Sequence, residues 1–78
     1  MKEYRTQEQF ESMYDNAYNG NWTDSFNNAV DYGFYFNDML LAAQETEWLL
    51  DEDGTPTKEA LENIGIIAEG AMKIRENR

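Results

Sequence analysis

Residues 24–50 read DSFNNAVDYGFYFNDMLLAAQETEWLL, and their spacing predicts the longest helix of the chain. The segment follows Thr23, a residue type that caps helix N-termini well, and Asp24 suits the first helical turn. One set of residues recurs at the intervals expected for a helix face that packs on a core. It consists of Phe26, Ala29, Val30, Gly33, Phe36, Leu40, Ala43 and Leu50.

Acidic residues form a second row on the same predicted helix. Four carboxylates recur every seven residues: Asp24, Asp31, Asp38 and Glu45. Seven residues advance a helix by about 10.5 Å and rotate it only ~20° short of two full turns. The four side chains would therefore lie in one narrow row. About 60° around the helix from it runs a second apolar row, made of Phe34, Leu41 and Trp48.

Gly33 is the weak point of this helix. A glycine in a helix interior costs about 1 kcal/mol relative to alanine, and the aromatic residues around it are only moderate helix formers. The sequence therefore leaves three alternatives. They are a continuous helix, a break or kink near Gly33, and a short strand through residues 32–36.

Residues 6–19 carry the signals of a shorter first helix. Thr6 and Gln9 have the spacing of a capping box, in which each side chain bonds the backbone of the other residue. Gly20 then supplies a left-handed stop. The apolar residues fall on one face, and they are Phe10, Met13, Tyr14, Ala17 and Tyr18.

A last helix is predicted from Thr55 or Thr57 to about Glu76, after a turn that contains Gly54 and Pro56. Three of its residues are small enough to permit a close approach of helices: Gly65, Ala68 and Ala71. Together the segments predict an all-α protein, an antiparallel three-helix bundle with a long central helix. A chain of this length makes a single acidic helical domain over residues 1–78.

The composition excludes most catalytic and metal-binding chemistry. The 78 residues include 16 Asp or Glu, 6 Lys or Arg and no Cys or His, which gives a formal net charge of −10. Without thiols and imidazoles the chain has no zinc ligands of the usual kind, no thiol nucleophile and no imidazole base. We therefore expect no enzymatic activity, no cofactor and no metal site. The turn after Leu50 is not a calcium loop, because alignment on Gly54 puts Leu49 and Ala60 at ligand positions.

The negative charge is concentrated in one part of the chain. Residues 6–57 contain eleven acids and no Lys or Arg, whereas residues 58–78 contain four of each. Such a protein repels nucleic acid and anionic membranes, so the expected partner is a basic protein surface. No apolar run is long enough for a membrane span or a signal core. We therefore expect a cytoplasmic protein, in the host cell if it is phage-encoded.

The predicted partner-binding site combines the acidic row, the acidic turn and two aromatic residues. These residues are Asp24, Asp31, Asp38, Glu45, Asp51, Glu52, Asp53, Tyr35 and Trp48. An aromatic residue flanked by charge is a common interface anchor, whereas Phe10, Tyr14, Phe26 and Phe36 are expected in the core. Amide side chains would add hydrogen-bond acceptors for Arg and Lys, and they are Asn16, Asn19, Asn21, Asn27, Asn28 and Asn37.

In size, in charge and in the base-free stretch that contains Glu8 and Asp53, the chain resembles a class of small acidic inhibitors. Phages and mobile elements use such proteins against host DNA-handling enzymes, and the class includes anti-restriction proteins, glycosylase inhibitors and some anti-CRISPR proteins. The resemblance implies a DNA mimic, a tight-binding protein that occupies a nucleic-acid groove and performs no chemistry. It carries no functional residue over to this chain.

Two other functions fit the same residues. The apolar row of Phe34, Leu41 and Trp48 would serve a helical interaction or assembly module, such as a homodimer, in which the acids only maintain solubility. An antitoxin that neutralises a basic nuclease would share the electrostatics of the inhibitor.

Overall fold

Four α-helices and one short 3-10 helix make up residues 5–78, the part of the chain that the computed structural model describes. In chain order they are α1 (Gln7–Tyr18), α2 (Trp22–Tyr32), α3 (Phe36–Gln44), η1 (Glu47–Leu49) and α4 (Lys58–Glu76). The all-α class is confirmed, since the only β-type pairing in residues 5–78 is an isolated bridge between Leu50 and Pro56. None of the described helices is long and apolar enough to cross a bilayer.

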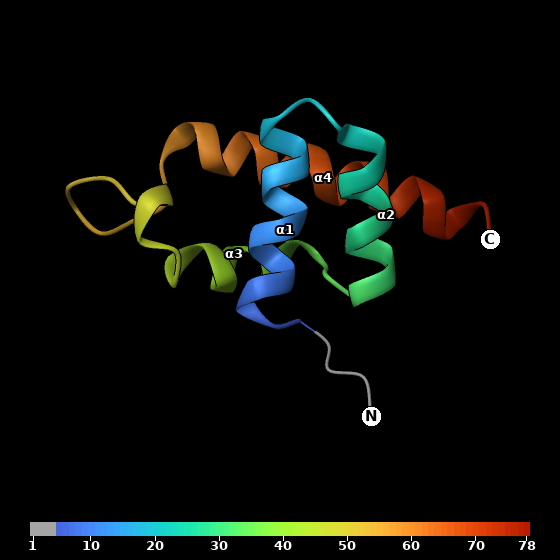
Figure 1. Ribbon diagram of the computed structural model, residues 1–78, viewed down its shortest axis with the longest axis horizontal. Coiled ribbons are helices and arrows are strands. Elements are labelled where there is room, and N and C mark those ends of the chain that lie inside the picture. The colour runs from blue at the N-terminus through green and yellow to red at the C-terminus, as the bar shows by residue number, and fades with distance from the viewer. Residues whose placement is uncertain (1–4) are drawn as a thin grey trace.

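The helices form a hairpin that packs on a crossing helix (Figure 1). α1 and α2 lie side by side and run in opposite directions, and a short turn joins them. α4 crosses behind this pair and packs mainly against α2, while α3 lies below the first half of α4 in this view. The expected antiparallel three-helix bundle is therefore replaced by four α-helices, in which α4 runs across an antiparallel pair.

The predicted long central helix is wrong, because the chain breaks at Gly33. Gly33 has φ 74°, a left-handed conformation that glycine adopts without steric cost. The N–H of Gly33 donates to the carbonyl of Val30 at 3.3 Å, and the N–H of Phe34 donates to that of Ala29 at 2.8 Å. These two hydrogen bonds make a Schellman cap. The break near Gly33 is thus confirmed, and the alternative of a short strand is not observed.

Burial of Phe34 is the physical reason for this break. Its side chain is 1% exposed, and its ring centroid lies 6.1 Å from that of Phe10. A continuous helix would hold Phe34 beside the acidic row, whereas the break turns it into the core, a gain of up to about 3 kcal/mol. The prediction that Phe34 belongs to an exposed apolar row is therefore wrong.

Arg75 of α4 holds the two sides of the break together. Its guanidinium donates to the carbonyls of Ala29 at 3.1 Å and Phe34 at 2.9 Å, and it lies 3.9 Å from the centroid of the Tyr35 ring. Ala29 lies near the C-terminus of α2, where a cation interacts well with the helix dipole. The two bonds span 46 and 41 residues of sequence, so no local pattern could reveal them.

The core lies between the four α-helices, each of which contributes buried side chains. Its largest fully buried apolar side chains are Tyr14, Phe10, Phe34, Met13, Met39, Ile64 and Ile67. Phe10 and Tyr14 are buried as predicted, and Phe26 packs against the core while remaining partly exposed. Phe36 was expected in the core and is 46% exposed, because it now begins a separate helix with a different register.

The first and last helices agree with their predicted bounds because their caps are local. The Thr6 hydroxyl accepts from the N–H of Gln9 at 3.1 Å, and the Gln9 side chain accepts from the N–H of Thr6 at 3.0 Å. Thr57 accepts from the N–H of Ala60 at 3.1 Å and so begins α4. Gly20 has φ 85°, as predicted for the stop after α1.

The close approach of two helices occurs at Gly70, not at the Gly65 of the predicted small-residue set. A Cβ added at Gly70 would lie 2.6 Å from the ring of Phe26 on α2, whereas at Gly65 it would meet nothing within 4 Å. Gly70 therefore allows the Phe26 ring of α2 to approach the backbone of α4 closely.

Candidate functional site

The predicted acidic row is divided between two helices. Asp24 and Asp31 lie on α2, whereas Asp38 is in the first turn of α3 and Glu45 follows its last residue. Asp38 and Glu45 line one hollow together with Leu41. The row is thus reduced to two pairs, Asp24 with Asp31 on α2 and Asp38 with Glu45 at the two ends of α3. The break at residue 33 prevents the four carboxylates from forming one straight row.

Two acids of this row stabilise helix N-termini, so their presence in the sequence does not require a binding partner. Asp24 lies in the first turn of α2, where a carboxylate stabilises the helix through its dipole. Asp38 accepts a hydrogen bond from the N–H of Tyr35 at 3.0 Å and thereby helps to begin α3.

Asp51 organises the acidic turn before α4. Its carboxylate accepts from the N–H of Asp53 at 2.9 Å, from the N–H of Thr55 at 3.2 Å and from the Thr55 hydroxyl at 3.0 Å. These hydrogen bonds, first that from the Thr55 backbone, hold the pKa of Asp51 below its ordinary value, because they stabilise the ionised form. Asp51 is therefore a turn residue as well as a charge.

The remaining predicted acids have no such role: Asp31, Glu45, Glu52 and Asp53. Asp31 lies in the last turn of α2 and Glu45 follows α3, positions where a carboxylate opposes the helix dipole, and neither helix has a basic residue in its last turn. Arg5 lines the same hollow as Glu45. The single ion pair within residues 5–78 joins Lys73 to Glu69 at 3.8 Å. Nothing local accounts for these four charges, which makes them the strongest candidates for contact with a partner.

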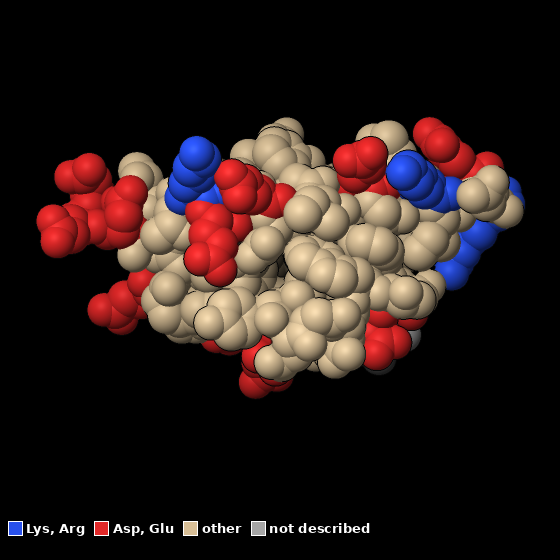
Figure 2. All heavy atoms as spheres, turned by 90° about the horizontal axis from the view of Figure 1, so that it is seen from above, with Lys and Arg blue, Asp and Glu red and all other residues tan. Residues whose placement is uncertain are grey.

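Acidic side chains gather at one end of the molecule. The chain from the end of α3 through η1 to the turn before α4 forms this end. It carries five exposed acids: Glu45, Glu47, Asp51, Glu52 and Asp53. Figure 2 shows acidic side chains projecting there, at the left of the view. We call this region the acidic end.

The two aromatic residues predicted to bind a partner have different surroundings. Tyr35 is exposed, but its ring lies against the Arg75 guanidinium and lines a hollow with Phe36 and Met72, a hollow that no acidic residue lines. Trp48 is 57% exposed, and its ring meets that of Tyr14 edge-on at 5.7 Å between centroids. Trp48 therefore remains available on the surface, whereas Tyr35 supports the break.

Some of the predicted amide acceptors are engaged within the protein. Asn16 of α1 donates to the side chain of Asn28 of α2 at 2.7 Å, which joins the two helices of the hairpin. Asn27 donates to the carbonyl of Thr23 at 3.0 Å. These contacts give the three residues structural roles that the sequence alone did not indicate.

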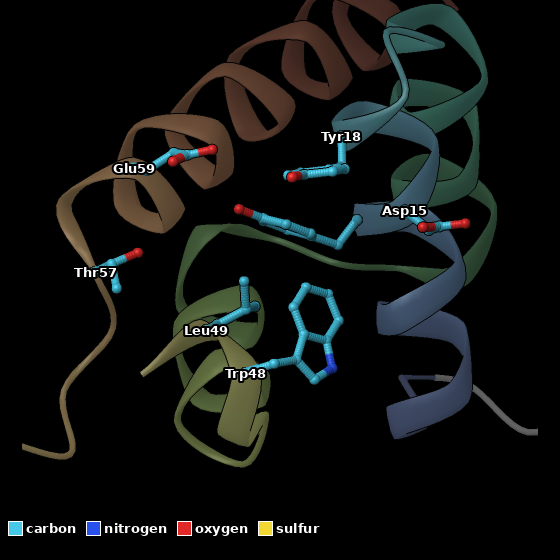
Figure 3. Close-up of a pocket in the computed structure, with 7 residues that line it drawn as sticks. Asp15, Tyr18, Trp48, Leu49, Thr57 and Glu59 are labelled. Carbon is cyan, nitrogen blue, oxygen red and sulfur yellow. The ribbon is translucent and has the colours of Figure 1, made fainter. Parts of the chain in front are cut away.

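Trp48 belongs to a pocket that the sequence did not predict. The pocket has a volume of about 480 Å³ and is lined by residues of α1, η1 and the start of α4: Tyr14, Asp15, Tyr18, Trp48, Leu49, Thr57 and Glu59. Figure 3 shows the rings of Trp48 and Tyr18 on opposite sides of it, with the Glu59 carboxylate directed toward Tyr18. The Asp15 carboxylate lies at the edge and points away. We call this site the aromatic pocket.

The electrostatics of the aromatic pocket are negative. No Lys or Arg is among its lining residues, which include two carboxylates. Burial raises the pKa of Tyr14, and the negative charge of Glu59 raises it further, while a hydrogen bond from Asn63 at 3.0 Å acts in the opposite direction. The carboxylate of Glu59 is thus close enough to act on the Tyr14 hydroxyl.

Sequence reasoning missed this pocket because its walls come from three separate segments. The one local signal was the spacing of Tyr14 and Tyr18, which places both rings on one side of α1. Glu59 lies in residues 58–78, where acids and bases are equal in number, so the charge distribution did not indicate it as a binding residue.

Neither a metal cluster nor a known relative assigns a function. Within the described residues, no group of three or more carboxylates is arranged to hold a metal ion. Comparisons with protein-family models, with curated proteins and with solved structures returned no match. Function must therefore be argued from the surface of this chain itself.

Proposed function

We propose that this protein is a non-enzymatic inhibitor that binds the basic nucleic-acid-binding surface of another protein in the cytoplasm, as a partial mimic of DNA or RNA. A CRISPR effector or a restriction enzyme has a surface of this kind. The observation that carries the proposal is the uncompensated negative surface. All acidic side chains that the structure describes are exposed, apart from the partly exposed Glu11 and Asp38, and only Glu69 has an ion-pair partner within residues 5–78.

Two basic residues of α4 are engaged within that helix or at the break, and within residues 5–78 neither forms an ion pair with the acids of α2 or of the acidic end. Arg75 points its guanidinium at backbone carbonyls, and Lys73 is paired with Glu69. Exposed like charges repel one another and lower stability, so a surface without compensation favours a role in binding over one in folding. A basic partner would remove this repulsion when it binds, and it would be attracted from a distance.

The dimensions limit how much of a nucleic acid the protein can imitate. The described residues extend over 40 Å in their longest direction. Duplex DNA of that length carries about 24 phosphates, at one charge per 1.7 Å of axis. The 16 carboxylates of this chain are fewer, and those that the structure describes are distributed over all four α-helices and the acidic end. The proposal is therefore for one face of a duplex or for a short single strand.

A capture experiment tests the proposal. The immobilised protein is exposed to host lysate at about 50 mM and about 500 mM salt, a range over which screening of exposed charges becomes much stronger. Duplex DNA is added as a competitor in parallel samples. We expect the captured protein to be a nucleic-acid-binding protein that both high salt and DNA release. Capture of proteins that neither treatment releases contradicts the proposal.

Charge variants locate the surface. Asp31→Asn with Asp53→Asn removes two acids that have no local role, and we expect weaker capture. Glu62→Gln with Glu76→Gln makes the same change of net charge within the balanced last helix and is the control. If both double variants lose affinity equally, net charge and not a defined surface causes the binding.

A second candidate is an association module, for which the structure favours a different surface from the predicted row. Phe34 is buried, and Leu41 and Trp48 line separate hollows. Exposed Phe36 and Met72 instead line one shallow apolar hollow between α3 and α4. A homodimer through this surface would dissociate in Met72→Glu, whereas a sedimentation profile that stays monomeric at high concentration removes this candidate.

The antitoxin alternative shares the electrostatics of the inhibitor and differs in its partner. A toxin gene beside the gene for this protein, together with capture of its basic nuclease product, would select the antitoxin.

A further inference from the structure

We propose that the aromatic pocket receives the guanidinium group of an arginine side chain. That this arginine belongs to the basic protein partner rests on the proposed function. The binding of guanidinium by the pocket does not, and it can be tested without the partner.

The aromatic rings supply the first half of the recognition. Tyr18 is 67% exposed and Trp48 is 57% exposed, so both rings leave much of their surface free beside the cavity. Tyr14 is buried beneath them and meets Trp48 edge-on. The free faces of tyrosine and tryptophan carry negative potential and attract a cation within about 6 Å of the ring centroid. Unburied aromatic rings of this kind are costly to leave in water and are typical anchors at interfaces.

Carboxylates supply the second half. Glu59 is directed toward Tyr18 across the cavity (Figure 3). Burial raises the pKa of Tyr14, and the negative charge of Glu59 adds to this effect. Asp15 adds a second negative charge at the edge. Glu59 lies in the first turn of α4, where the helix N-terminus carries partial positive charge. With no Lys or Arg lining the pocket, the two carboxylates keep it negative.

The combination selects a guanidinium over other groups. An anion would be repelled by both carboxylates, and a purely apolar group would cover the Glu59 carboxylate without giving it a partner. A guanidinium is planar, so it stacks on an aromatic ring and at the same time donates hydrogen bonds to a carboxylate at its edge. A lysine ammonium is more strongly hydrated and cannot stack in this way. The volume of about 480 Å³ leaves room for such a side chain to enter from the surface.

The test uses small ligands and the intact protein. N-acetyl-arginine methylamide, the citrulline analogue of the same shape and no charge, and the lysine analogue are each titrated against labelled protein, and the indole N–H signal of Trp48 is followed by NMR. Trp22, which lies outside the pocket, is an internal control. We expect the arginine ligand to shift the Trp48 signal and to bind at least about tenfold more tightly than citrulline. Equal binding of citrulline or of lysine overturns the proposal, as does an unchanged Trp48 signal.

Three variants separate the pocket from general charge attraction. Glu59→Gln removes the central carboxylate and should weaken the arginine ligand about tenfold, the scale of one charge-assisted hydrogen bond. Trp48→Leu keeps apolar bulk without an aromatic face and should weaken it likewise, with Tyr18 ring signals as the readout. Asp24→Asn changes net charge by the same amount on α2 and should have no effect. A loss of affinity in Asp24→Asn equal to that in Glu59→Gln overturns the proposal.

Failure of the guanidinium proposal can be distinguished from failure of the proposed inhibitor function. If the ligand binds the pocket but partner capture is unchanged in Glu59→Gln and Trp48→Leu, the pocket binds guanidinium and its assignment to the partner is wrong. If the ligand fails to bind while capture still responds to salt, DNA and Asp31→Asn with Asp53→Asn, the pocket proposal fails and the inhibitor proposal stands.

Discussion

Replacing Gly70 by alanine perturbs the contact between α2 and α4, and the same change at Gly65 provides a matched control. Both glycines lie inside α4 in helical conformation, so alanine at either position should add about 0.8–1 kcal/mol of helix propensity. The surroundings differ. At Gly65 the new Cβ meets open space, whereas at Gly70 it would lie 2.6 Å from three ring atoms of Phe26.

The steric contact at Gly70 sets the magnitude. Overpacking of a well-packed contact costs about 1–3 kcal/mol. A cost of about 1 kcal/mol would cancel the gain in helix propensity, and a cost of about 3 kcal/mol would exceed it. We therefore expect Gly65→Ala to stabilise the protein by up to about 1 kcal/mol, and Gly70→Ala to be neutral or to destabilise it by up to about 2 kcal/mol. A difference of 1 kcal/mol corresponds to about 4–8 °C in Tm for a domain of this size.

Urea and thermal unfolding followed by circular dichroism measure both variants. Phe26→Leu in the Gly70→Ala background replaces the clashing ring by a smaller side chain. The double variant should therefore lose less free energy of unfolding than the two single variants lose in sum. If Gly70→Ala stabilises the protein as much as Gly65→Ala does, α2 and α4 do not approach at this glycine and the packing argument is wrong.

Three further predictions concern the break and the acidic turn. Arg75→Met should lower the free energy of unfolding by about 2–3 kcal/mol, because a charged donor to two carbonyls is lost. Arg78→Met, the control, should change it by less than about 0.5 kcal/mol. Equal effects of the two variants in denaturant unfolding would refute the role of Arg75 at the break. Gly33→Ala should cost about 1–2 kcal/mol in the same assay, since alanine is strained at positive φ, and a stabilised variant would indicate a continuous helix. The pKa of Asp51, measured by carboxyl NMR, should lie below its ordinary value of 3.8 and should rise in Thr55→Val. Because the pKa of Asp51 is lower in the folded state than in the unfolded state, ionised Asp51 stabilises the fold at pH values above the unfolded-state pKa. This stabilisation is lost as the pH falls through the folded-state pKa.

The sequence determined the features that depend on neighbouring residues. Thr6 with Gln9 and Thr57 with Ala60 are three residues apart, so the starts of α1 and α4 could be read from cap chemistry. The left-handed stop at Gly20 is equally local. The charge of the chain and its uneven distribution also follow directly from the sequence, and with them the expectation of a basic partner.

The acidic row shows where local reasoning stops. The heptad spacing of its four carboxylates predicted one helix, and Gly33 left a break or kink as an alternative. The choice depended on burial of Phe34 against Phe10 and on two hydrogen bonds from Arg75, contacts that only the folded chain makes. Once the break formed, Asp38 became a cap of α3 and the row was divided.

Tertiary structure likewise decided which aromatic residues are exposed beside a cavity. Trp48 gains its place in the aromatic pocket from Tyr14 and Tyr18 on α1 and from Glu59 on α4, segments that no periodicity connects. The sequence by itself determined that the protein is acidic and helical, and the prediction of a basic partner rests on that charge. Where the charges and the aromatic anchor lie was decided by packing, because burying Phe34 outweighs the continuity of one helix.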